Sequence, residues 1–281
     1  MRSDRSEQVL GIHRDGKRDG KDMRPLPMFV APWLSSDDRK DFYHAFSHIF
    51  RNPLVGAVGY MDYLFRGDSG NLTQEQMAQL GNAREAVLQL ERVVDTLMDL
   101  VAFDMGLIQP QKKPINLNEF LNKFHGLKEW ASAEKTQVSL FLPKTPLWIA
   151  GDEKWLRNLI YELLSNAVRV SPKRSPVRVE LYQNQNYAVC CVEDKGPGVP
   201  PDRLNWIFQP LTQLRRQGDS PRGERGGLGL ALSAHIIYNH GGYIWAELVR
   251  GGGLAVSMKF PLINASTGRE SEIVVEGGRH A

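Results

Sequence analysis

The chain has 281 residues, enough for about two domains at roughly 150 residues each. Its composition, 42% hydrophobic and 24% charged, excludes a largely disordered protein, and a net charge of +3 is too small to indicate nucleic acid or an anionic membrane as the main partner. The only cysteines, Cys190 and Cys191, are adjacent, which fits a reducing compartment rather than a disulfide scaffold. No apolar run approaches the ~18 residues of a membrane helix, so we expect a cytoplasmic protein without a membrane span.

The first element predicted is a long helix after a charged N-terminal stretch. Residues 1–35 are expected to be a flexible tail, because charged residues and prolines dominate them. Ser36, followed by two aspartates, is typical of a helix start. Apolar residues then recur at steps of three and four, at Phe42, Phe46, Ile49, Pro53, Ala57, Tyr60 and Leu64.

A second helix is predicted after a turn at residues 67–71. Thr73 and Gln76 have the spacing of a capping box. A heptad seam follows, at Leu80, Ala83, Val87, Leu90, Val94, Leu97 and Val101. Residues 36–103 therefore predict an antiparallel helical hairpin. Because one hairpin leaves its seam half uncovered, we expect two copies to form a homodimeric four-helix bundle through 36–103.

The character of the sequence changes after residues 104–115, which we interpret as a linker. Helical patterns cover 118–134, 152–169 and 228–239, and alternating patterns predict β-hairpins within 177–191 and 243–260. Residues 116–262 are thus expected to form a mixed α/β sandwich, and the fold class of the whole chain is α+β. Residues 263–281 are expected to be a second flexible tail.

Two glycine-rich segments are candidates for ligand binding. Asp194-Lys-Gly196-Pro-Gly198 follows a predicted strand, where a buried aspartate can accept a hydrogen bond from an amine and the glycines allow close backbone approach. Gly227-Leu228-Gly229 opens a predicted helix, an arrangement that exposes backbone N–H groups to a phosphate. Each segment taken alone is equally compatible with an ordinary turn.

Polar residues on the predicted helix 152–169 are candidates for metal binding. Glu162, Asn166 and Arg169 are spaced to lie on one face, and both Glu162 and Asn166 offer oxygen ligands for Mg²⁺. A solvated polar stripe would look the same. The stretch 209–225 is rich in glycine, proline and arginine, which favours a lid over phosphates; its arginines are Arg215, Arg216, Arg222 and Arg225.

The order and spacing of these segments resemble the ATP-binding domain shared by histidine kinases, gyrase-type ATPases, ninety-kilodalton heat-shock chaperones and mismatch-repair ATPases. In this resemblance Glu162–Asn166 is the N box, Asp194–Gly198 and Gly227–Gly229 are the two glycine boxes, and Phe208 is the phenylalanine box. The resemblance implies that ATP and Mg²⁺ are the cofactors. It also implies that Asp194 binds the adenine amine, that Asn166 binds Mg²⁺, and that the lid closes over the triphosphate.

The first predicted helix indicates which of these families the chain resembles most. Residues 47–54, Ser-His-Ile-Phe-Arg-Asn-Pro-Leu, resemble the phosphoacceptor box of histidine kinases, with His48 as the acceptor and His44 as a lesser candidate. Asn52 stands at the position associated with phosphatase activity. The resemblance covers about 36–262. It implies a cytoplasmic histidine kinase without a recognisable sensor domain, which phosphorylates its own His48 from ATP and passes the phosphoryl group to an aspartate of a response regulator receiver domain.

Three positions depart from that pattern. Ile49 replaces the usual acidic residue after the acceptor, Glu162 stands where many histidine kinases have Asn, and Arg225 replaces the first glycine of the second glycine box. Ile49 motivates one alternative, a degenerate kinase that binds nucleotide and acts as a dimeric scaffold or regulator of a response regulator. Glu162 motivates another, an ATPase or serine kinase of the same superfamily.

Overall fold

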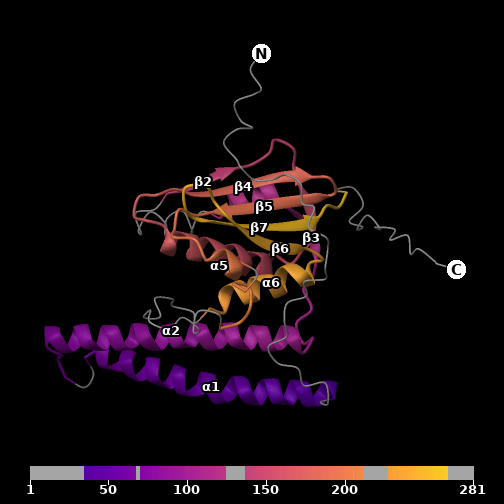
Figure 1. Ribbon diagram of the computed structural model, residues 1–281. Helices are drawn as coiled ribbons and strands as arrows, with labels where there is room; N and C mark the ends of the chain where they lie inside the picture. The colour runs from indigo at the N-terminus through magenta and orange to yellow at the C-terminus, as the bar shows by residue number, and fades with distance from the viewer. Residues whose placement is uncertain (1–34, 68–69, 125–136, 205, 212–226, 265–281) are drawn as a thin grey trace. The chain divides into compact units, whose positions relative to one another are not determined.

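The computed structural model describes residues 35–67, 70–124, 137–204, 206–211 and 227–264 (Figure 1). Contacts between residues divide the chain into two compact units. The hairpin unit holds the described residues of Pro25–Gln109 and Trp206–His235, and the sheet unit holds those of Pro110–Asn205 and Ile236–Ala281. The boundary between them falls within helix α6, Gly229–Asn239.

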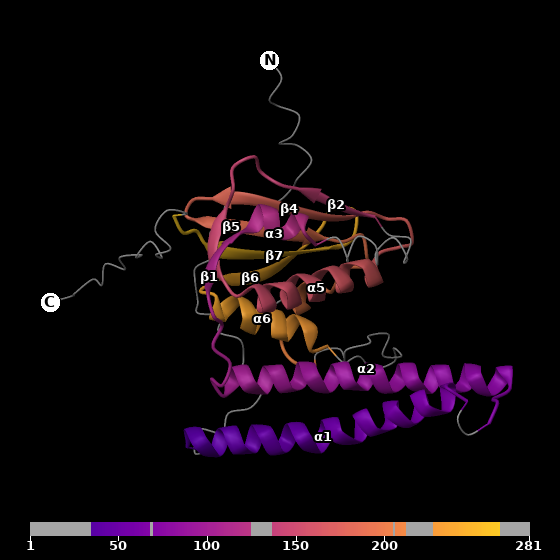
Figure 2. The same cartoon turned by 180° about the vertical axis from the view of Figure 1, so that it is seen from behind.

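Two long antiparallel helices make up most of the hairpin unit. Helix α1 spans Ser36–Phe65 and helix α2 spans Gln74–Asp104, and the two lie side by side (Figure 2). Helix α1 contains Pro53 near its middle, and Figure 2 shows the helix changing direction partway along, as expected when a proline removes a backbone hydrogen bond. The predicted pair of helices is confirmed.

Side chains at both helix starts satisfy backbone N–H groups that have no partner within the helix. At α2 the Thr73 hydroxyl accepts a hydrogen bond from Gln76 N, and the Gln76 side chain accepts one from Thr73 N, so the predicted capping box is confirmed. At α1 the cap is Ser35, one residue before the predicted Ser36, because Asp38 rather than a later residue completes a capping box with it.

A five-stranded sheet forms the centre of the sheet unit, in the order β2-β4-β5-β7-β6. Only β2 and β4 run parallel, and the other neighbours are antiparallel. A separate antiparallel pair joins β1 and β3. The strands are β1 Lys113–Asn116, β2 Val138–Phe141, β3 Trp148–Gly151, β4 Val177–Asn184, β5 Tyr187–Glu193, β6 Tyr243–Leu248 and β7 Leu254–Pro261.

Helices α3, Leu117–Asn122, and α5, Glu153–Val170, pack on one face of this sheet and close its core. In β4 the residues facing them, such as Val177 and Val179, are fully buried, while the alternate residues, such as Arg178 and Glu180, are half-buried. The predicted β-hairpin of β4 and β5 is confirmed, with a turn at Gln185 and Asn186. Strand β5 is buried from Ala188 to Glu193 rather than on alternate residues, because it lies in the middle of the sheet.

Three short strands were not predicted. Lys113–Asn116, in the segment expected to be a linker, pairs with β3, and β2 pairs with β4. Each of these strands has four residues, too few for a clear period, and is stabilised by a partner distant in sequence. The helix predicted over 118–134 begins as α3, and most of its remainder lies outside the described residues, as do the tails 1–34 and 265–281.

The chain therefore has the expected α+β fold, with a helical N-terminal part followed by an α/β sheet domain. In the described ranges, no helix combines the length and the apolar composition needed to cross a bilayer.

Candidate functional site

Helix α5 positions the three polar side chains expected near a nucleotide. Asp152 caps its start, where Oδ1 accepts a hydrogen bond from Lys154 N at 3.0 Å. At its other end Arg169 Nη2 donates to Asn166 Oδ1 at 2.6 Å, so these two side chains act together. Glu162 lies one turn before Asn166 and is only 8% exposed. The three residues are therefore not a uniformly solvated stripe, because one carboxylate belongs to the buried side of the helix.

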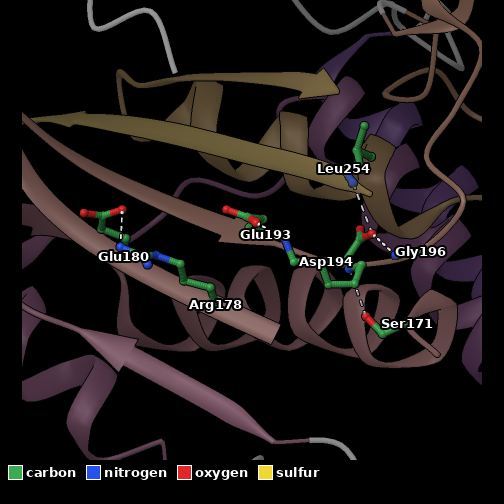
Figure 3. Close-up of polar contacts among 8 residues, drawn as sticks. Ser171, Arg178, Glu180, Glu193, Asp194, Gly196 and Leu254 are labelled. Carbon is green, nitrogen blue, oxygen red and sulfur yellow. Dashed lines mark hydrogen bonds and ion pairs between the residues drawn. The ribbon is translucent and has the colours of Figure 1, made fainter. Parts of the chain in front are cut away.

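Asp194 is a buried carboxylate at the end of β5 (Figure 3). Its Oδ1 accepts two backbone hydrogen bonds, from Gly196 N at 2.8 Å and from Leu254 N at 3.1 Å. Within the described chain these bonds engage only Oδ1, so Oδ2 is the oxygen left for a ligand. Burial raises the pKa of this carboxyl, and the two backbone hydrogen bonds partly oppose that effect.

Gly196 joins the aspartate loop to the end of α5. A Cβ atom at this position would lie 2.8 Å from Val170 Cγ2 and 2.9 Å from the Val170 carbonyl oxygen. The next contact along the loop is a hydrogen bond from Lys195 N to Ser171 Oγ at 3.3 Å. Any side chain larger than hydrogen at Gly196 would separate the loop from α5. The structure thus brings together the two predicted segments that contain Asn166 and Asp194.

A glycine turn between β6 and β7 supports the other side of the same loop. Gly253 has φ of +108°, and a Cβ there would collide with the Asp194 carbonyl oxygen. Gly198, with φ of +67°, would place a Cβ 3.1 Å from the Gly253 carbonyl oxygen. Gly253 and Leu254 were not among the predicted site residues. The available signal was the run of three glycines at 251–253 in a predicted hairpin turn.

The second glycine segment belongs to the hairpin unit. Gly227 adopts φ of +74°, and Gly229 is the first residue of α6. The Leu228 side chain is 1% exposed, so only its backbone is available to a ligand. Phe208 is half-buried in a turn of the same unit. The lid arginines Arg215, Arg216, Arg222 and Arg225 lie outside the described residues.

The candidate phosphoacceptor is exposed on α1. His48 and Asn52 lie one turn apart and both face solvent, while Ser47 beside them is buried. Ile49 is 67% exposed, so the residue that follows the histidine offers an apolar rather than an acidic side chain. One turn after His48, Arg51 Nε donates to Asp95 Oδ1 of α2 at 2.8 Å.

The described residues contain no group of three or more His, Cys, Asp or Glu side chains able to hold a metal ion. The oxygens that Glu162 and Asn166 offer are few, as is usual for Mg²⁺ sites in which phosphate oxygens and water supply most ligands. Arg169 uses one lone pair of the Asn166 amide oxygen and leaves the second. The donor set therefore fits a Mg²⁺ ion that arrives with a nucleotide.

A sheet covered by helices on one face, with a buried aspartate at a strand end and a neighbouring asparagine on a helix, fits the ATP-binding domain that the sequence resembles. Residues 151–264 match the family model of the histidine kinase-, DNA gyrase B- and HSP90-like ATPases. This match covers the second part of the chain, less than half of its 281 residues.

Sequence relatives extend the similarity beyond the ATPase domain. The sensor protein kinase WalK of Staphylococcus aureus is 29% identical over 230 residues, which cover 80% of this chain and 54% of that relative. A longer WalK sequence, from strain USA300, aligns over 80% of this chain and 37% of its own length. The chain therefore spans about half or less of the curated relatives that it matches.

Solved structures share the fold. Full-length ShkA in complex with AMPPNP has a TM-score of 0.68 at 22% identity, over 80% of this chain and 46% of that one. The Acinetobacter baumannii histidine kinase AdeS has a TM-score of 0.53 at 21% identity, over 77% of this chain and 98% of that one. The family match, the WalK relatives and this shared fold together support a histidine protein kinase core.

Proposed function

We propose that this protein is an ATP-dependent histidine kinase that phosphorylates its own His48 and passes the phosphoryl group to an aspartate of a response regulator receiver domain. The observation that carries the proposal is the buried Asp194 carboxylate. Its Oδ1 is fixed by two backbone N–H groups, so Oδ2 is presented in one orientation to an exocyclic amine such as that of adenine. Gly196 and Gly198 allow a flat base to approach the backbone of the loop.

The polar end of α5 is proposed to bind the Mg²⁺ that accompanies ATP. Asn166 supplies an amide oxygen and Glu162 a carboxylate, and when bound the ion neutralises phosphate charge. Arg169 holds the Asn166 amide through its hydrogen bond and fixes the direction of the oxygen. Gly227, Leu228 and Gly229 offer backbone N–H groups at the start of α6, an arrangement that binds phosphate by itself.

His48 is proposed to be the nucleophile. A nitrogen lone pair of the neutral imidazole forms a bond to the γ-phosphorus, and the bond from phosphorus to the β,γ-bridging oxygen breaks, so its electron pair leaves with ADP. The exposed position of His48 on α1 leaves the ring open to a nucleotide and afterwards to a receiver domain. Asn52, one exposed turn later, is proposed to act in the reverse hydrolysis of the phosphorylated partner.

A homodimer through 36–103 is the proposed assembly. Helix α1 leaves large apolar side chains exposed in one chain, including Ile49 at 67% and Tyr60 at 75%. A groove between α1 and α2 is lined by Phe65, Gly81 and Leu88 together with the charged residues Asp62, Arg84, Glu85 and Arg92, and a helix of the second copy is proposed to pack along it. We place the reaction in the cytoplasm, where ATP is available and the buried thiols of Cys190 and Cys191 stay reduced.

One observation favours a second candidate function. Residues 44–52 of α1 contain neither Asp nor Glu, so no carboxylate on this helix lies within a turn of His48. A chain that binds nucleotide but transfers no phosphate would act as a dimeric scaffold for a response regulator. This candidate keeps the role of Asp194 and removes that of His48.

Incubation with γ-labelled ATP tests the proposal. The expected product is an acid-labile, base-stable label on the wild-type protein that is absent from His48→Gln and retained by the matched control His44→Gln. Asp194→Asn should abolish ATP binding in calorimetry, because the amide presents a donor as well as an acceptor to the adenine amine.

The outcomes separate the candidates. Label that persists in His48→Gln contradicts the acceptor assignment. ATP binding without any label in the wild type selects the scaffold. Wild-type affinity for ATP in Asp194→Asn would overturn the nucleotide site itself.

A further inference from the structure

The flank of the hairpin that carries His48 lacks an acidic residue on its own helix. An imidazole that attacks phosphorus develops positive charge, and a carboxylate on its other ring nitrogen stabilises that charge and orients the ring. The nearest carboxylates on α1 are those of Asp41, two turns before His48, and Asp62, about four turns after it. Ile49 is exposed and apolar. Within the described residues of one hairpin, a carboxylate for His48 can come only from α2, the helix beside it (Figure 2).

Two ion pairs fix which residues of α2 lie opposite α1. Arg51 Nη2 lies 2.8 Å from Asp95 Oδ1, and Arg84 Nε lies 2.7 Å from Asp62 Oδ1. The partners are eleven residues apart on each helix, 51 to 62 and 84 to 95, so both contacts define the same antiparallel register. Moving toward the start of α1 therefore means moving toward the end of α2.

This register brings Asp99 to the level of His48. His48 lies three residues before Arg51, about 4.5 Å along the helix axis, and Asp99 lies four residues after Asp95, about 6 Å in the same direction. Residues three or four apart share a helix face, so His48 and Arg51 form one flank of α1, and Asp95 and Asp99 form the facing flank of α2. Asp99 is thus the carboxylate whose axial level matches that of the histidine.

The charge distribution on this flank agrees with the register. The hydrogen bond to Asp95 is the main cause that raises the pKa of Arg51, and the nearby Asp99 carboxylate also raises it. Arg51, one turn from His48, thus pairs with Asp95 and lies close enough to Asp99 for the two charges to interact. Asp99 is half-buried on α2.

We propose that Asp99 is the positioning residue for His48, an inference that rests on the proposed function. The Asp99 carboxylate accepts a hydrogen bond from the ring nitrogen that carries hydrogen, and the lone pair of the other nitrogen then points outward to the γ-phosphorus. As the nitrogen–phosphorus bond forms and the phosphorus–oxygen bond to ADP breaks, the proton stays on the first nitrogen. Its hydrogen bond to Asp99 stabilises the imidazolium.

Self-labelling kinetics of three α2 variants test the inference. Asp99→Asn should lower the rate of His48 labelling by about 100-fold, the scale of a lost acid–base partner, without changing the KM for ATP. Asp99→Glu keeps a carboxylate and should recover most of the rate. Glu91→Gln removes another half-buried carboxylate of the same helix, two turns away, and should label like the wild type. Thermal melts check that all variants fold.

The outcomes distinguish this inference from the proposed function. If the wild type labels His48 and Asp99→Asn labels as fast, the inference is overturned and the kinase assignment stands. If Asp99→Glu is as slow as Asp99→Asn, the carboxylate has no positioning role, and that also overturns the inference. If the wild type does not label at all, the proposed function fails and the inference fails with it.

Discussion

The two units differ in how completely one chain covers its apolar side chains. In the sheet unit, residues such as Leu159, Val179 and Met258 are fully buried. In α1 the only buried side chain among those described is that of Ser47, while Tyr60 is 75% exposed. The sheet unit therefore obtains its stability from a core that one copy completes, whereas helix α1 of the hairpin unit depends on surface contacts and on whatever covers its exposed apolar residues.

The largest loss of stability in the sheet unit is expected from a substitution in the turn that supports Asp194. Gly253→Ala should destabilise the protein by about 3 kcal/mol, because alanine is strained at φ of +108° and its Cβ collides with the Asp194 carbonyl oxygen. Urea unfolding with a tryptophan signal measures this loss.

The matched control for that change is Gly59→Ala in α1, where nothing lies within 4 Å of the added methyl. It should stabilise the helix by roughly 0.5–1 kcal/mol, since alanine restricts the unfolded chain. Equal effects of the two substitutions would contradict the contrast between the units.

A smaller loss is expected at a buried histidine that joins two elements of the sheet unit. His240 Nε2 accepts a hydrogen bond from Asp152 N at 3.0 Å, so the ring is neutral and its Nδ1 donates to the Ile236 carbonyl oxygen at 2.7 Å. His240→Ala leaves both backbone groups unpaired and should cost about 2–3 kcal/mol.

The same histidine predicts a dependence of stability on pH. Burial lowers the pKa of His240 below its ordinary 6.5, so the unfolded chain binds its proton first. Its contribution is complete above pH 6.5 and is lost as the pH falls through the folded pKa. The difference in unfolding free energy between wild type and His240→Ala should therefore shrink below pH 6.5. A difference that is constant from pH 8 to 5 would show that the ring is not held neutral.

A further effect is expected at the exposed apolar residues of α1. Tyr60→Asp should weaken self-association at least tenfold, because a charge replaces an aromatic side chain proposed to lie between two copies. Sedimentation velocity over a concentration series measures it. Val55→Asp is the control, since Val55 is 60% exposed but lies on the flank of His48 rather than on the stripe that contains Tyr60. Equal effects at the two positions would place the interface elsewhere.

Sequence patterns that span a few residues predicted most of the helices and strands. The three-and-four spacing gave α1 and α2, and alternation gave the hairpin of β4 and β5. Strands β1 and β3 were missed because four residues carry no period and their pairing is between segments distant in sequence. Contacts between distant segments also explain why only part of the candidate site was predicted. Asp194 and Gly196 form a local motif, whereas Gly253 supports them from a different hairpin, and its run of glycines predicts a turn without indicating which segment the turn contacts.

The two ion pairs of the hairpin differ in how much they say about alignment. Arg51 faces Asp95, but sliding α2 by four residues either way would offer it Asp99 or Glu91, which are carboxylates too. Asp62 would meet Leu80 or Leu88 after the same slips, and only Arg84 satisfies it. The ion pair near the turn therefore specifies the register of the hairpin. Although this exposed pair contributes little energy, it forms only in the observed register and not when α2 is shifted by four residues.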